Sequence, residues 1–101
     1  MPKHYEYFGL IVMFYANEHD PVHVHGKCQG RETTADLVII DGLVKEIRFL
    51  RQSGRLPLSD SEKRYFEEIV NAKADDIVKK WIDFFVLHKS ITPEVISRRL
   101  K

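Results

Sequence analysis

The sequence lacks several features that mark particular classes of protein, such as paired cysteines and long apolar runs. It contains one cysteine, Cys28, in 101 residues, so no disulfide can form within the chain and a reducing compartment is expected. No apolar run approaches the ~20 residues that a membrane-spanning helix needs. The N-terminal residues also lack the apolar segment of a secretory signal. These absences predict a cytoplasmic protein that does not engage a membrane.

An excess of charge of one sign is also missing. Sixteen basic residues stand against fifteen acidic ones, for a formal net charge of +1. A dedicated nucleic-acid-binding domain normally carries a clear basic excess. Two local basic groups remain, one at Arg48, Arg51 and Arg55 and one at residues 98–101, and solvated surface explains them best. Nucleic acid is therefore a weak candidate partner, though not an excluded one.

The composition, with 44% apolar and 31% charged residues, is that of one ordinary globular domain spanning residues 1–101. The N-terminal half, within residues 7–50, is rich in β-branched and aromatic residues and predicts four strands. Asp41-Gly42 is a two-residue hairpin signal. The strands are expected at Tyr7–Tyr15, Val22–Cys28, Thr33–Ile40 and Leu43–Leu50. Their short links predict a mainly antiparallel sheet.

The C-terminal half, within residues 59–101, predicts helices. Ser59 followed by Glu62 has the spacing of a capping box, which satisfies unpaired amides at a helix start. Two apolar stripes of helical spacing follow within residues 65–85, with a turn or kink between them. Thr92-Pro93 is typical of a third helix start. The predicted fold is α+β, with a four-stranded, mainly antiparallel sheet packed against two or three C-terminal helices.

Three of the five histidines, His19, His23 and His25, fall within seven residues. On a strand, His23 and His25 point to one face with Cβ atoms about 7 Å apart. Two imidazoles at that separation can reach one metal ion, and His19 on the preceding turn can supply a third nitrogen. These three histidines are therefore candidate ligands of a divalent transition metal such as zinc, although the sequence indicates no obvious fourth ligand.

The same histidines fit two other interpretations. Without a metal, two imidazoles can act as general acid and base on a phosphodiester, with Lys27 or Arg31 as the nearby cation. In that interpretation His19, His23 and His25 are the candidate catalytic residues. Alternatively, they line the polar face of a strand and hydrogen-bond to their neighbours without doing chemistry.

Cys28 requires no catalytic role. On a regular strand its side chain falls on the face opposite His23 and His25. We expect it to be a small buried side chain rather than a thiolate ligand.

The segment Phe14–His25, preceded by Tyr7-Phe8-Gly9, carries an Asn-acid-His-x-Pro-x-His-x-His run that resembles the bacterial domain-of-unknown-function family 4160. The similarity extends to a Gly-Arg-Leu-Pro loop and a helix carrying Trp81 and Phe85, so it covers most of the chain. The family has no established activity, and the resemblance implies no catalytic residues. Its members are described as lying beside another small domain, in arrangements like toxin–antitoxin pairs.

The resemblance therefore implies a partner, a second small protein encoded nearby. A homo-oligomer is the other expectation, because the apolar helix stripes can leave a face for a dimer. The leading hypothesis is a partner-binding component of a toxin–antitoxin-like pair, with the histidine strand as its functional face. The alternative is a metal- or histidine-dependent hydrolase acting on nucleic acid or a nucleotide.

Overall fold

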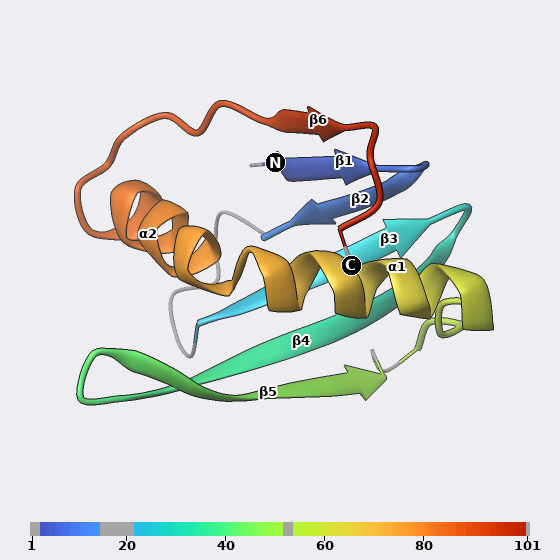
Figure 1. Cartoon of the computed structure of the whole chain (residues 1–101), viewed down its shortest axis with the longest axis horizontal. Helices are drawn as coiled ribbons and strands as arrows, with labels where there is room; N and C mark the ends of the chain where they lie inside the picture. Colours follow the sequence, from blue (N-terminus) through green and yellow to red (C-terminus); the bar gives the residue numbers. More distant parts are fainter. Residues whose placement is uncertain (1–2, 15–21, 52–53, 101) are drawn as a thin grey trace.

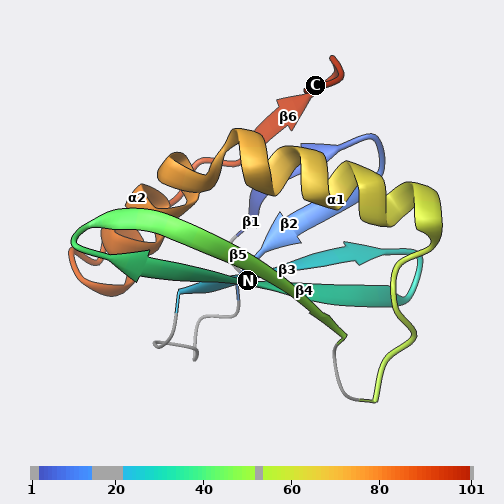
Figure 2. The same cartoon turned by 60° about the horizontal axis from the view of Figure 1, so that its bottom comes forward.

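The structure, a computed structural model, describes residues 3–14, 22–51 and 54–100. Six strands form one sheet in the order β5-β4-β3-β2-β1-β6, and both helices pack on the same side of it (Figures 1 and 2). Neither helix has the length and apolarity needed to cross a bilayer. The elements in chain order are β1 (Lys3–Tyr7), β2 (Leu10–Met13), β3 (His23–Cys28), β4 (Arg31–Ile40), β5 (Leu43–Arg51), α1 (Asp60–Ala72), α2 (Ala74–Phe85) and β6 (Glu94–Ile96).

Two-residue turns form three hairpins, β1–β2, β3–β4 and β4–β5. Asp41 and Gly42 have φ values of 53° and 78°, which match the type I′ turn that suits a twisted hairpin, and the predicted β4–β5 hairpin is confirmed. Phe8 and Gly9 form a similar turn, with φ values of 50° and 82°. The single strand predicted for Tyr7–Tyr15 is therefore wrong, because the chain reverses here between β1 and β2. Phenylalanine rarely adopts positive φ, so Phe8 does not indicate a turn in the sequence.

The sheet is six-stranded and mixed, so the prediction of a four-stranded, mainly antiparallel sheet is wrong. One added strand is β1, which the Phe8-Gly9 turn separates from β2. The other is β6, which pairs parallel with β1 and stands where a third helix was predicted from Thr92-Pro93. Val95 and Ile96 are β-branched and favour extended backbone, and the edge of β1 supplies their hydrogen-bonding partners. Strands therefore extend beyond residues 7–50, and the described chain has two helices.

The two helices begin and break where the sequence indicates. The Ser59 hydroxyl accepts a hydrogen bond from the Glu62 amide, and the Ser59 amide donates to the Glu62 carboxylate at 2.9 Å. This confirms the capping box. Lys73, with φ −114° and ψ 18°, separates α1 from α2, which confirms the predicted break. Each helix can then direct its own apolar stripe toward the sheet.

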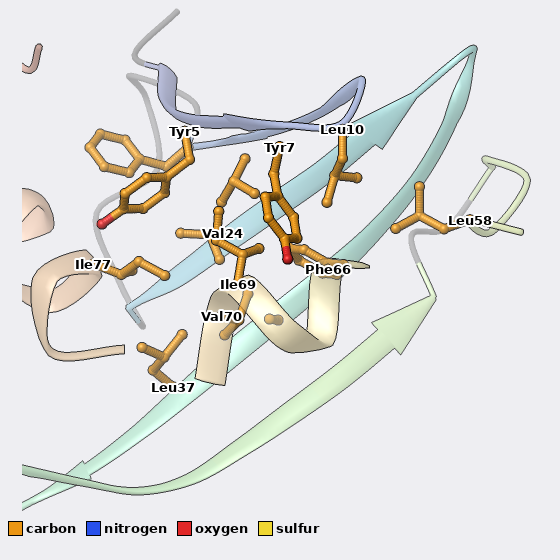
Figure 3. Packing of buried hydrophobic residues seen from close by; sticks show 13 residues of the cluster. Tyr5, Tyr7, Leu10, Val24, Leu37, Leu58, Phe66, Ile69, Val70 and Ile77 are labelled. Carbon is orange, nitrogen blue, oxygen red and sulfur yellow. The ribbon is translucent and has the colours of Figure 1, made fainter. Parts of the chain in front are cut away.

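The hydrophobic core lies between the helices and the sheet (Figure 3). Gly26 on β3 allows α1 to approach the sheet closely, since a Cβ atom at this position would lie 2.7 Å from Cδ1 of Phe66. The buried side chains come from four of the strands, from both helices and from the segment before α1. They include Tyr5, Tyr7, Leu10, Val24, Leu37, Leu58, Phe66, Ile69, Val70 and Ile77.

Candidate functional site

The candidate site lies on the sheet face opposite the helices. Strand alternation places His23, His25 and Lys27 on this face, whereas Val24 and Gly26 point toward the helices. The antiparallel partner β4 contributes three polar residues directly opposite these three. Figure 2 shows both helices on the other side of the sheet. We define the histidine face as His23, His25, Lys27, Glu32, Thr34 and Asp36.

A buried pair of side chains lies at the centre of the histidine face. His25 Nδ1 lies 2.7 Å from Glu32 Oε2, and the two side chains are only 2% and 3% exposed. An ionised carboxylate can only accept, so with Glu32 ionised Nδ1 is the donor of this hydrogen bond. Arg55 lies at the other carboxylate oxygen, with Nε 3.9 Å from Glu32 Oε1.

His23 lies beside this pair. The ring centroids of His23 and His25 are 5.3 Å apart, and the ring planes are tilted by 71°. The prediction that the two imidazoles share one face is confirmed. His23 is half-buried, whereas His25 is buried, with Met13 of β2 opposite it in the sheet. One imidazole is therefore fixed by a carboxylate, and the second lies next to it and nearer the solvent.

The third histidine of the predicted site, His19, lies outside the described residues. Within residues 3–14, 22–51 and 54–100, no three histidine, cysteine or acidic side chains are grouped closely enough to hold a metal ion. The zinc hypothesis therefore stays a prediction. If a metal is bound, Glu32 is placed to orient His25 from behind, as carboxylates commonly do for metal-ligating histidines.

Sequence reasoning missed the three residues that β4 contributes to the histidine face, Glu32, Thr34 and Asp36. Glu32 matters most, because it contacts His25 directly. Glu32 lies seven positions after His25 in the sequence. The β3–β4 hairpin places Lys27 directly opposite Glu32, and His25 is the next residue of β3 on the same face, so the side chains of His25 and Glu32 can meet. This register follows from a two-residue turn at Gln29-Gly30. Treating that turn as a two-residue hairpin would have placed Glu32 diagonally across from His25.

The two cations considered beside the histidines lie on different faces. Lys27 shares the histidine face. Arg31 is opposite Cys28 in the sheet, and its guanidinium donates to the Pro57 carbonyl at 3.1 Å. Cys28 packs at the margin of the core, where burial, followed by the hydrogen bond and charge of Glu62, raises the pKa of its thiol. The thiol form is therefore favoured, which makes Cys28 a poor thiolate ligand.

Carboxylates accompany several of the basic residues considered for nucleic acid. Arg48 Nε donates to Glu46 at 2.7 Å, and the Arg99 guanidinium pairs with Glu68. Arg55 lies near Glu32, as described above. These arginines do not form an uncompensated basic patch, which agrees with the balanced charge of the sequence.

Fold and site together define a small α+β protein with both helices on one sheet face and paired histidines on the other. Residues 9–82 match the family described as "Domain of unknown function (DUF4160)", and the chain belongs to this family. The resemblance seen in the sequence is confirmed. The matched span contains the whole histidine face and leaves β1 and β6 outside. No curated protein and no solved structure matches the chain.

Proposed function

We propose that this protein is the partner-binding component of a toxin–antitoxin-like pair, acting in the cytoplasm and using the histidine face as its functional surface. The partner is a second small protein encoded nearby, as the family resemblance implies. The observation that carries the proposal is the buried His25–Glu32 pair, which lies on a sheet face that no described helix covers.

The energetics of this pair support a role other than stability. Removing an imidazole and a carboxylate from water costs free energy that their mutual attraction only partly offsets. Apolar side chains of similar size are often at least as stable in such positions. A fold selected for stability alone has little reason to keep His25 and Glu32 here. The contact with Glu32 fixes the orientation of the His25 ring, and the His23 ring packs against that ring.

The residues around the pair suit recognition of a polar protein surface. His23, Lys27 and Asp36 are each half-buried, so their backbones are held by the sheet while part of each side chain reaches solvent. Together they offer both hydrogen-bond donors and acceptors. Such side chains on regular strands hold their positions better than side chains on loops. A partner can therefore meet a surface that is already arranged for binding.

The test is co-expression of this chain with the small protein encoded beside it, followed by affinity purification and measurement of the Kd. His23→Ala removes the half-buried imidazole and leaves the buried pair, and Lys63→Ala on the exposed side of α1 is the matched control. We expect His23→Ala to weaken binding at least about tenfold, or about 1.4 kcal/mol, and Lys63→Ala to leave binding unchanged. A wild-type chain that does not bind its neighbour, or equal affinities for both variants, contradicts the proposal.

The alternative function, hydrolysis of nucleic acid or a nucleotide, is favoured by one specific feature. A carboxylate on Nδ1 of one histidine, with a second imidazole 5.3 Å away between ring centroids, is an arrangement suited to general acid–base catalysis. RNA, DNA and nucleotides should each be incubated with purified protein, with zinc and with a chelator. Cleavage lost in His23→Ala, with the fold retained by circular dichroism, supports this alternative. Absence of cleavage by the wild type under every condition rejects it.

A further inference from the structure

The two edges of the sheet differ. At one edge β6 covers β1, and at the other β5 is the last strand, with no described strand on its outer side (Figure 1). An unpaired strand presents a row of backbone amide and carbonyl groups that can pair with another chain. At nine residues, β5 is long for an uncovered edge strand. Its outer side is therefore a candidate interaction surface.

We infer that this edge is the interface between two copies of the chain. Two β5 strands pair antiparallel about a twofold axis at Ile47, which joins the two sheets into one continuous sheet. A twofold interface of this kind uses the same surface on both copies, so the strand must be complementary to itself. The charges on β5 meet that requirement in this register.

The register follows from the charged residues in the middle of the strand. With the axis at Ile47, Glu46 of each copy lies opposite Arg48 of the other copy. An axis at Arg48 places two arginines opposite each other, and an axis at Glu46 places two glutamates opposite each other. Opposite charges across a strand pair stabilise it by about 0.2–1 kcal/mol, and like charges destabilise it. The Ile47 axis is therefore favoured over the axes at the two neighbouring residues.

The same two residues are already arranged within one copy. Arg48 Nε donates to Glu46 Oε2 at 2.7 Å, although the side chains are 58% and 52% exposed. In the proposed dimer, the Glu46–Arg48 pair of one copy lies beside the same pair of the other copy, so that negative and positive side chains alternate. Each arginine can then reach a carboxylate in its own chain and one in the second copy, since its guanidinium carries five N–H donors.

Apolar surface on the helix side of β5 supports the same pairing. Ile47 and Val44 are half-buried and line a groove of about 350 Å³, which also includes Asn71 and Ala74 at the break between the helices. About the proposed axis, the two Ile47 side chains meet at the floor of the two grooves. Their contact removes apolar surface from water that a single copy leaves partly exposed.

A bulge limits the size of this interface. The β4–β5 register shifts between Val38 and Ile39, which leaves Lys45 as an extra residue in β5. Such bulges interrupt regular pairing, so the regular contact between copies is confined to the centre of the strand. We therefore expect a weak dimer, with a Kd on the order of micromolar to hundreds of micromolar.

Charge reversal provides the test, with sedimentation velocity from about 1 to 500 μM, a range chosen to span the expected affinity. Glu46→Arg alone sets arginine opposite Arg48, and Arg48→Glu alone sets glutamate opposite Glu46. We expect either change to raise the dimer Kd at least about tenfold. An equimolar mixture of the two variants should dimerise again, because every opposite pair is then complementary. The double variant Glu46→Arg/Arg48→Glu should also dimerise.

Thermal melts of each variant show whether the fold is retained. The mixture contains the same two variants that fail to dimerise alone, so dimerisation of the mixture shows that neither substitution acted by unfolding the chain. A wild-type chain that stays monomeric throughout the range overturns the inference. So do single variants that dimerise like the wild type, or a mixture that stays monomeric. If the wild type is monomeric and Glu46→Arg instead abolishes binding of the protein encoded nearby, the edge belongs to that partner and not to a second copy.

Discussion

Gly26→Ala tests how the helix layer meets the sheet. An added Cβ would lie 2.7, 2.8 and 2.9 Å from Cδ1, Cε1 and Cγ of Phe66, well inside carbon–carbon contact. The Phe66 ring is fully buried and packs edge-on against Phe49, with centroids 5.6 Å apart. The ring cannot easily turn away, so α1 must move off the sheet or the core must rearrange.

The expected cost is that of overpacking a core, about 1–3 kcal/mol. In a domain of this length 1 kcal/mol corresponds to roughly 4–8 °C in Tm, so Gly26→Ala should lower the Tm by about 4–24 °C in a thermal melt. Without the contact the sign would be reversed, because alanine is normally better than glycine in the middle of a strand. A Tm equal to or above that of the wild type would refute the reasoning.

A double-mutant cycle assigns the cost to Phe66. Phe66→Leu shortens the facing side chain and opens space beneath position 26, at its own cost to stability. The additional penalty of Gly26→Ala in this background should be smaller by at least about 1 kcal/mol, since residues in contact are not additive. The same penalty in both backgrounds would show that the contact with Phe66 is not its cause.

Further predictions concern the capping box, the C-terminal segment and the buried pair. The hydrogen bond from the Ser59 backbone lowers the pKa of Glu62 below its usual 4.5. A carboxyl whose pKa is lowered on folding stabilises the fold above its unfolded pKa and loses that contribution as the pH falls through the folded pKa. The free energy of unfolding should therefore fall more steeply between about pH 5 and pH 3 in the wild type than in Glu62→Gln, and parallel profiles would exclude this role. Arg99 pairs with Glu68, and the next amide, of Leu100, donates to the Tyr7 hydroxyl at 2.7 Å. Arg99→Ala should cost only about 0–1 kcal/mol but should speed amide exchange in β6, and unchanged exchange there would show that the ion pair does not hold the strand. His25→Leu alone leaves a carboxylate buried without its imidazole and should cost about 3–5 kcal/mol, whereas His25→Leu/Glu32→Leu should recover most of that loss. A double variant no more stable than the single one would contradict this account of the pair.

The sequence predicted those features that depend on local residue chemistry. The Ser59–Glu62 cap and the Asp41-Gly42 turn are each decided within a few residues. The shared face of His23 and His25 follows from strand alternation, so it could be predicted once the strand was located.

The features that were missed depend on contacts between distant parts of the chain. The β1–β2 turn places Phe8 at positive φ, where its ring packs against Tyr65 with centroids 5.5 Å apart. β6 forms as a strand only because β1 offers an edge to it. Glu32 joins the site through the register of the β3–β4 hairpin, which brings it to His25 from seven positions away in the sequence.

The most direct test of the central claim is the affinity of His25→Leu/Glu32→Leu for the small protein encoded nearby. The claim is that the buried pair serves the histidine face and is not needed for stability. We predict that the double variant unfolds at a Tm close to that of the wild type but binds the partner at least about tenfold more weakly. A folded double variant that binds the partner as tightly as the wild type would contradict the claim.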